Sequence, residues 1–260
     1  MKSETSSRLD EIVAERNGIT RSQARALIIE GRVRVNGAPA TKPGTSIRDG
    51  AAIEVERPRP FVSRGGEKLD RALSEFGIDV RGMRALDIGA STGGFTDCLL
   101  QRGAAHVVAV DVGYGQLDWG LRNDPRVTVM ERTNFRTLAA DAFAGEPFDL
   151  IAADASFISL RTILARAVSF LAPAGEIVAL VKPQFEAGRA RLGKRGVVRD
   201  PEVHRAVLRE IRDAMPELGL IPSALTASPL VGPAGNREFL LRLTRRGEAL
   251  SDARIDEVVG

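Results

Sequence analysis

Hydrophobic residues within 63–245 occur in short runs that are separated by longer amphipathic stretches. Short apolar runs predict buried strands, and the stretches between them, with apolar residues three or four positions apart, predict helices. The predicted strands cover 84–88, 106–111, 127–131, 148–154, 176–182, 220–227 and 237–244. Strands that alternate with helices predict an α/β domain built on a doubly wound, mostly parallel, seven-stranded sheet.

The N-terminal part of the chain follows a different pattern. Apolar residues on one face predict a helix over Ser7–Asn17, and a second helix over Arg21–Glu30 begins after the capping residue Thr20. Alternating segments follow, and the pair Asn36-Gly37 predicts a hairpin turn between two short strands. Residues 1–56 are therefore predicted to form a separate, small α+β domain.

The distribution of charge divides the chain near the same place. Residues 1–62 hold 11 Lys and Arg against 8 Asp and Glu, whereas residues 63–260 hold 26 of each, so the net charge of +3 lies in the N-terminal part. Such an excess is typical of a surface that faces nucleic acid, although a solvated surface gives the same small imbalance by chance. Two prolines predict a stiff linker over 57–62, between this part and a larger domain over 63–245. Residues 246–260 are predicted to be a C-terminal tail.

A glycine-rich turn follows the first predicted strand of the larger domain. Gly89, Gly93 and Gly94 leave room for a ligand against the backbone, and the helix that follows directs free N–H groups toward an anionic group. The next strand ends at Asp111, where a carboxylate can accept hydrogen bonds from a ribose diol. The glycine spacing departs from G-x-G-x-x-G and fits S-adenosylmethionine, but the loop alone leaves a nicotinamide dinucleotide open.

The residues after the fourth predicted strand narrow the chemistry. That strand ends at Asp154, and Ala155-Ser156-Phe157 follows in place of the Asn/Asp-Pro-Pro-aromatic sequence typical of enzymes that methylate base amines. Methylation of a pyrimidine carbon requires a cysteine near the site, and the single cysteine, Cys98, falls on the helix after the glycine turn. Oxygen methylation is therefore the favoured chemistry.

Lysine is rare in this chain, with five residues against 32 arginines. Lys182 closes the apolar run of the fifth predicted strand, and Lys68 lies at the start of the larger domain. A partly buried lysine can lose its proton, whereas an arginine stays charged, so these positions favour proton chemistry over two ordinary surface lysines. Glu238, at the start of the last predicted strand, carries no signal by itself.

Taken together, four residues of the larger domain resemble a known catalytic set. Lys68, Asp154, Lys182 and Glu238 are similar to the Lys-Asp-Lys-Glu tetrad of ribose 2′-O-methyltransferases of the FtsJ type. The N-terminal domain resembles the alpha-L RNA-binding domain of a small-subunit ribosomal protein, through Thr20–Arg25 and Gly31–Gly37. The whole chain thereby resembles the TlyA family of rRNA 2′-O-methyltransferases, whose members are also called haemolysins.

This resemblance implies a Rossmann-like class I methyltransferase fold, S-adenosylmethionine as cofactor, and ribosomal RNA (16S and/or 23S) as partner. Lys182 is implied as the base or as the group that stabilises the developing alkoxide, Asp154 as the residue that holds it, and Lys68 and Glu238 as the rest of the hydrogen-bond frame. The cofactor-binding residues implied are Asp87, Gly89, Ser91, Thr92, Gly93, Gly94, Phe95, Asp111 and Asn134. The expected RNA-binding residues are Arg21, Arg25, Arg32, Arg34, Lys42, Arg64, Arg189, Arg191, Lys194 and Arg195. No metal is required.

Two other classes of protein compete with this hypothesis. A non-catalytic RNA-binding or ribosome-assembly factor keeps the fold without the reaction, and the intact tetrad disfavours it. A cytolysin fits the haemolysin name, but the N-terminus lacks the apolar core of a signal peptide, no apolar run reaches about 18 residues, and one cysteine cannot form an internal disulfide. The chain is expected to be cytoplasmic and monomeric, with ribosomal subunits rather than a membrane as partner.

Overall fold

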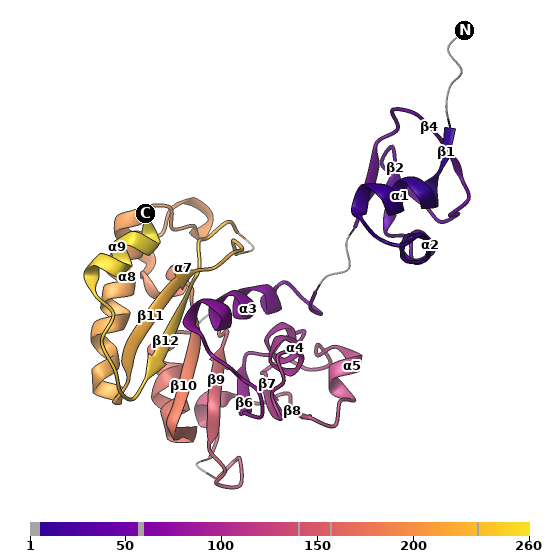
Figure 1. Ribbon diagram of the computed structural model, residues 1–260. Helices are drawn as coiled ribbons and strands as arrows, with labels where there is room; N and C mark the ends of the chain where they lie inside the picture. The colour runs from indigo at the N-terminus through magenta and orange to yellow at the C-terminus, as the bar shows by residue number, and fades with distance from the viewer. Residues whose placement is uncertain (1–5, 57–59, 140, 157, 233) are drawn as a thin grey trace. The chain divides into compact units, whose positions relative to one another are not determined.

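Figure 1 shows a computed structural model of the chain, which describes residues 6–56, 60–139, 141–156, 158–232 and 234–260. The chain forms two compact units, Met1–Arg59 and Pro60–Gly260. Residues 57–59 of the expected linker lie outside the described residues. The rest of that segment belongs to the second unit, where Phe61 is buried and the Val62 N–H donates a 2.8 Å hydrogen bond to the Asp97 carboxylate.

The first unit combines two helices with short antiparallel strands. In chain order it contains β1 (Ser6–Arg8), α1 (Leu9–Asn17), α2 (Arg21–Ile29), β2 (Val33–Val35), β3 (Ala38–Ala40), β4 (Ser46–Arg48) and β5 (Ile53–Val55). Strand β2 lies between β3 and β5, and β1 pairs with β4. The buried core consists of Leu9, Val13, Ala24, Ile28, Val33 and Ile47. Thr20 caps α2, because its hydroxyl accepts a 3.3 Å hydrogen bond from the Gln23 N–H.

The first helix begins two residues later than the sequence predicts. A helix is expected from Ser7, whereas α1 starts at Leu9. Ser6–Arg8 instead pairs antiparallel with Ser46–Arg48. This polar stretch has no apolar side chain to bury as a helix, and pairing with β4 satisfies its backbone groups.

A seven-stranded sheet forms the centre of the second unit, with the strand order β11-β12-β10-β9-β6-β7-β8. The strands are β6 (Arg84–Ile88), β7 (His106–Val110), β8 (Val127–Met130), β9 (Phe148–Ala153), β10 (Leu171–Val181), β11 (Ile221–Ala227) and β12 (Phe239–Thr244). Neighbouring strands are parallel from β10 to β8, and only β12 runs antiparallel to its two neighbours. The predicted doubly wound, mostly parallel sheet is confirmed.

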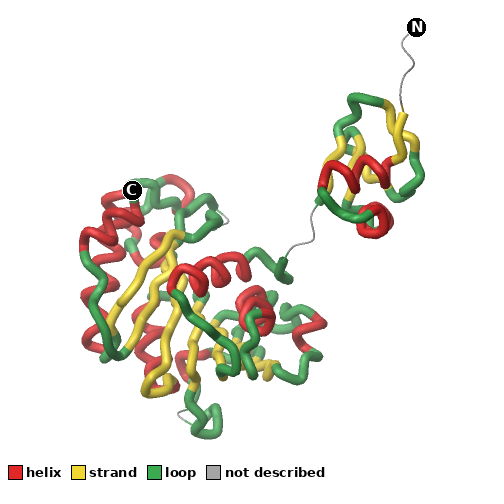
Figure 2. Tube along the Cα trace, in the orientation of Figure 1, coloured by secondary structure: helices red, strands yellow, loops and turns green. Residues whose placement is uncertain are grey.

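Helices cover both faces of this sheet (Figure 2). They are α3 (Gly65–Phe76), α4 (Gly94–Gln101), α5 (Trp119–Arg122), α6 (Leu160–Ala167), α7 (Pro183–Glu186), α8 (Pro201–Ala214) and α9 (Asp252–Val259), with single turns at η1 (Phe135–Thr137), η2 (Val168–Phe170), η3 (Arg189–Arg191), η4 (Lys194–Gly196) and η5 (Met215–Leu218). Side chains along each strand alternate between the two faces. On β10, Ile177 and Ala179 join the core under α6 and α8, whereas Val178 and Leu180 join the core under α3 and α4.

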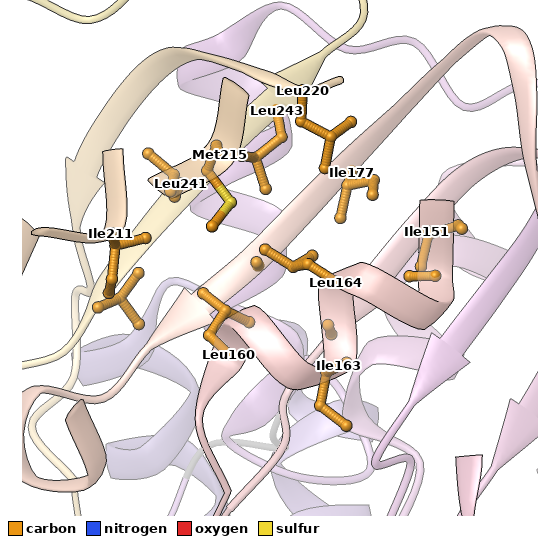
Figure 3. Packing of buried hydrophobic residues seen from close by; sticks show 14 of the residues in the cluster. Ile151, Leu160, Ile163, Leu164, Ile177, Ile211, Met215, Leu220, Leu241 and Leu243 are labelled. Atoms are coloured by element: carbon orange, nitrogen blue, oxygen red, sulfur yellow. The ribbon is translucent and has the colours of Figure 1, made fainter. Parts of the chain in front are cut away.

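Figure 3 shows the larger of these two cores from close by. Leu160 and Leu164 from α6 meet Ile211 from α8, and strand residues such as Ile177 and Leu241 close the space between them. Each large aliphatic side chain buried in this way stabilises the fold by about 1.5–3 kcal/mol before the entropy of ordering is subtracted. Burial on both faces explains why the strands are recognisable as continuous apolar runs.

Residues 246–260, predicted to be a C-terminal tail after the larger domain, instead include a helix that packs on that domain. Ser251 caps helix α9, and Ile255 and Val259, four residues apart on one face of that helix, are buried in the larger of the two cores. Helix α9 packs on α8 and β11, and Arg209 of α8 forms an ion pair with Asp256 at 2.7 Å. This segment therefore belongs to the second unit.

Candidate active site

The carboxyl ends of β9 and β10 bring the first pair of candidate residues together. Asp154 follows β9, Lys182 follows β10, and the two strands are parallel neighbours. Lys182 Nζ lies 2.5 Å from Asp154 Oδ1, and these side chains are 11% and 23% exposed. Lys182 Nζ also donates a 2.7 Å hydrogen bond to Ser156 Oγ, so the loop after β9 holds the amine by two contacts.

A second ion pair joins Lys68 and Glu238. Their Nζ and Oε2 atoms are 2.5 Å apart, and the side chains are only 12% and 2% exposed. Glu238 immediately precedes β12, whose first residue, Phe239, pairs with Val181 at the end of the antiparallel β10. The antiparallel pairing therefore places Glu238 beside the end of the strand that carries Lys182.

Both ion pairs line one cavity of about 960 Å³. We call it the lysine cavity, and its wall includes Lys68, Asp154, Ser156, Lys182, Gln184, Arg189, Arg195 and Glu238. The structure thus brings together all four members of the expected catalytic tetrad. A buried carboxylate with a lysine partner keeps its charge at a lower free-energy cost than an isolated one, because each charge solvates the other.

A second cavity, of about 520 Å³, adjoins the lysine cavity, and both are lined by Asp154, Ser156 and Ile158. We call it the glycine-loop cavity, because Gly89 and Ser91 from the turn after β6 line it together with Asp111 and Asn134. The Asp111 carboxylate accepts hydrogen bonds from the Ser91 N–H at 2.8 Å and the Gly113 N–H at 2.6 Å. These bonds fix the carboxylate at the end of β7.

Gly89 has a steric reason to be glycine. Its φ is +86°, and a Cβ atom there would lie 2.6 Å from the backbone oxygen of Asp154. A side chain at this position would therefore push apart the ends of β6 and β9, where the two cavities meet.

Within the described part of the chain, the lining of the glycine-loop cavity does not include the other expected cofactor-binding residues, Asp87, Thr92, Gly93, Gly94 and Phe95. Asp87 is fully buried, and its Oδ2 accepts a 2.7 Å hydrogen bond from the Thr96 hydroxyl. Burial, reinforced by the charges of Asp154 and Asp111, raises the pKa of Asp87 to about 7 despite this bond. Thr96 lies in the first turn of α4, so Asp87 fastens that helix beneath the loop and does not face the cavity as expected.

Of the expected RNA-binding residues of the first unit, Arg21, Arg25, Arg34 and Lys42 are exposed, and Arg32 is half-buried. Three of these five residues also have a partner within the unit. Arg21 forms an ion pair with the buried Asp10 at 3.2 Å, Arg32 pairs with Glu30 at 2.8 Å, and Arg34 donates to the Gly37 carbonyl at 3.0 Å. The contact between Arg21 and Asp10 joins α2 to α1, so this arginine also stabilises the fold.

The basic residues after Lys182 divide in the same way. Arg189 and Arg195 line the lysine cavity, whereas Arg191 pairs with Glu210 at 2.8 Å and donates to the Ala187 carbonyl at 2.6 Å. Arg64 is exposed just before α3. The side chain of Lys194 lies outside the described part of the chain.

Sequence reasoning missed two residues that hold the site in place. The Glu186 carboxylate accepts hydrogen bonds from the Leu160 N–H at 2.7 Å and the Ser159 hydroxyl at 3.0 Å, and so caps α6 from the segment that follows Lys182. Asn236 is buried, and its Oδ1 accepts a 2.9 Å bond from the Val198 N–H, which anchors the basic loop close to Glu238. Neither residue belongs to a pattern with recognisable spacing, because both act across loops.

The fold and this site define a class of protein, and comparison with known proteins identifies it. Residues 61–245 match the FtsJ-like methyltransferase family, and residues 7–53 match the S4 domain. The chain belongs to the FtsJ-like methyltransferase family, and this membership implies the use of S-adenosylmethionine. Within the part of the chain that the structure describes, no helix is both long and apolar enough to span a membrane.

Several known proteins are similar over nearly the whole chain. The 16S/23S rRNA (cytidine-2′-O)-methyltransferase TlyA of Mycobacterium tuberculosis is 52% identical, over 94% of this chain and 92% of that protein. Hemolysin A of Brachyspira hyodysenteriae is 42% identical over 90% of this chain and 98% of its own length. A solved structure of a putative hemolysin from Streptococcus thermophilus superposes with a TM-score of 0.75 at 41% identity, and covers 99% of this chain and 95% of that one.

Proposed function

We propose that this chain methylates the 2′-hydroxyl of cytidine in ribosomal RNA, with S-adenosylmethionine as methyl donor. The observation that carries the proposal is that the lysine cavity and the glycine-loop cavity share part of their lining. Asp154, Ser156 and Ile158 line both cavities, so a ligand beside the two lysines and a ligand beside the glycine loop would meet at these residues. The names of the similar proteins supply the RNA class and the nucleoside.

The glycine-loop cavity suits the donor. Gly89 provides a surface without a side chain, the Asp111 carboxylate can accept hydrogen bonds from a ribose diol, and Asn134 lies on the same wall, where an adenine can reach it. S-adenosylmethionine supplies an electrophilic methyl group when it is bound. Asp87 contributes indirectly, because it holds the first turn of α4 under the loop.

The lysine cavity suits the acceptor. A 2′-hydroxyl is a weak nucleophile at neutral pH, so its proton must be removed or its developing negative charge must be stabilised. Lys182 can do either, as a neutral amine that takes the proton or as an ammonium that faces the oxygen, and Asp154 holds it in both cases. Alignment of the two reactants contributes up to about 7–11 kcal/mol in favourable systems.

The second ion pair, between Lys68 and Glu238, fixes part of the wall of the lysine cavity. Glu238 is almost inaccessible to solvent and pairs with Lys68, so each of the two side chains has a fixed position at the wall. Arg189 and Arg195 lie on the same wall and provide cations for RNA phosphates.

The test uses ribosomal subunits isolated from cells that lack this protein. Parent protein and radiolabelled S-adenosylmethionine are expected to produce 2′-O-methylcytidine, detected by mass spectrometry of digested rRNA. Lys182→Ala is expected to lower the rate at least about 100-fold, as loss of a catalytic acid–base group does, while S-adenosylmethionine still binds in calorimetry.

Two results would contradict this function. Donor binding by the parent without any methylated nucleoside points instead to a non-catalytic RNA-binding factor. The hemolysin names of similar proteins add a membrane-lytic alternative, which release of dye from liposomes by micromolar protein would support.

A further inference from the structure

Ser156 occupies the place where the two cavities meet, since it lines both of them. Its hydroxyl oxygen accepts a hydrogen bond from Lys182 Nζ at 2.7 Å. Asp154, two residues earlier on the same loop, holds the same nitrogen at 2.5 Å. Two side chains of one short loop therefore contact the amine that faces the acceptor.

These two contacts restrict the geometry of the amine. A protonated lysine has three N–H groups in a tetrahedral arrangement. One of these N–H groups donates to the Ser156 hydroxyl, and the ion pair with Asp154 keeps the nitrogen beside the end of β9, so the orientation of the remaining N–H groups is set largely by Ser156. The long, flexible side chain of Lys182 would lose this orientation if it were held by one contact only.

The loop that carries Ser156 is itself held at both ends. At its start the Asp154 N–H donates to the Ile88 carbonyl at 2.9 Å. At its far end the Leu160 N–H and the Ser159 hydroxyl donate to the Glu186 carboxylate. Because Glu186 follows Lys182 by four residues, the loop is fastened to the segment that begins with the lysine. Ser156 thus lies two residues after an anchored position, Asp154.

We propose that Ser156 is a positioning residue for methyl transfer: its hydrogen bond orients the Lys182 amine toward the 2′-oxygen of the acceptor. The proposal rests on the proposed function. It predicts that loss of the Ser156 hydroxyl slows the transfer step and does not affect the binding of either substrate.

The experiment compares Ser156→Ala, Ser156→Thr and the parent on ribosomal subunits, over pH 6 to 10. A hydrogen bond to a charged group corresponds to about tenfold or more in an equilibrium constant, so Ser156→Ala is expected to lower kcat about tenfold. The KM values for donor and RNA are expected to stay within about twofold. A limb of the pH–rate profile is expected to differ between Ser156→Ala and the parent, because the Lys182 amine loses its hydrogen-bond acceptor in the variant.

Two further variants make the result specific. Ser156→Thr keeps the hydroxyl and is expected to restore most of kcat and the parent limb. Ser169→Ala is the matched control, because the exposed Ser169 hydroxyl donates a 2.8 Å bond to the Arg166 carbonyl at the opposite end of β10. This control is expected to leave both kcat and the pH profile unchanged.

The outcomes distinguish a wrong role for Ser156 from a wrong proposed function. If the parent methylates 2′-hydroxyls and Ser156→Ala shows the parent kcat and the parent pH limb, the role of Ser156 is wrong and the proposed function stands. If Ser156→Ala raises only KM, the residue contacts a substrate and does not position Lys182. A parent that produces no 2′-O-methylated nucleoside overturns the proposed function, and this inference with it.

Discussion

At the scale of single residues, a buried carboxyl supports the site without facing it. Asp87 is fully buried under the glycine loop, with the Thr96 hydroxyl on one oxygen and the charges of Asp154 and Asp111 nearby. Loss of solvation is the main cause that raises its pKa from 3.8 to about 7. The folded protein therefore keeps a proton on Asp87 over a pH range in which the unfolded chain has lost it.

This difference makes the stability of the protein depend on pH. Between about pH 4 and pH 7 the folded state binds one more proton than the unfolded state, so the free energy of unfolding falls as pH rises through that window. The loss amounts to about 1.4 kcal/mol per pH unit and ends above the folded pKa. Asp87→Asn carries no charge at any pH, so its stability relative to the parent is expected to rise from pH 5 to pH 7.

Urea unfolding followed by far-UV circular dichroism at pH 5, 6, 7 and 8 measures this effect. Asp141→Asn, which removes an exposed carboxylate on a turn, is the control and is expected to follow the parent at every pH. Parallel curves for Asp87→Asn and the parent would show that Asp87 does not hold its proton in the folded state.

At the scale of elements, the ends of three adjacent strands build the site. The turn after β6 passes so close to the end of β9 that only glycine fits at position 89. The loop after β9 then contacts the segment after β10 through Ser156 and Glu186. Because these contacts join neighbouring strand ends, a change in one turn is transmitted to both cavities.

A substitution at the glycine turn tests this coupling. Gly89→Ala combines a positive φ with a Cβ atom 2.6 Å from the Asp154 oxygen, whereas Gly145→Ala has a positive φ with nothing within 4 Å. Backbone strain alone costs about 1–3 kcal/mol, so Gly145→Ala is expected to lose that much stability and bind donor normally. Gly89→Ala is expected to lose more stability and to weaken donor binding at least about tenfold in calorimetry. Equal behaviour of the two variants would contradict the close approach of β6 and β9.

The elements that the sequence predicts are those with a local signal. The central strands are continuous apolar runs, and Thr20 marks the start of α2 by its capping chemistry. The start of β10 is missed because Pro173 and Gly175 look like a turn, although the strand begins at Leu171. The tetrad is found only through family resemblance, since Glu238 is ordinary until β12 places it beside Lys68. Ser156 and Glu186 act through contacts between loops, which leave no spacing in the chain.

At the scale of the whole molecule, the proposed binding of RNA depends on which basic residues are available to phosphates. The number of arginines overstates the positive charge that is available to RNA phosphates, because many arginines already have a carboxylate partner. Arg191 is held by Glu210, whereas Arg189 and Arg195 line the lysine cavity. A count of charges along the sequence cannot distinguish an arginine that is paired with a carboxylate from one that lines the cavity.

The salt dependence of RNA binding distinguishes them. A plot of log K against log salt has a negative slope, and its magnitude decreases by about 0.7–0.9 for each phosphate that the protein no longer neutralises. The double variant Arg189→Gln/Arg195→Gln is therefore expected to reduce this magnitude by about 1.5. Arg191→Gln is the matched control and is expected to change the slope much less. Filter binding of the rRNA substrate between 50 and 300 mM salt, roughly the range over which such interactions weaken, measures the slopes. Equal slopes for the parent and the double variant would place the phosphate-binding residues elsewhere.

The wall shared by the two cavities has a practical consequence. Since Asp154, Ser156 and Ile158 border both spaces, a single compound with a nucleoside arm on each side of this wall can fill both at once. The second arm then binds at the high effective concentration set by its short tether, and the affinity of the joined compound exceeds that of either half. Such a bisubstrate inhibitor depends on a junction of this kind, and an enzyme with only one of the two spaces would bind just half of it.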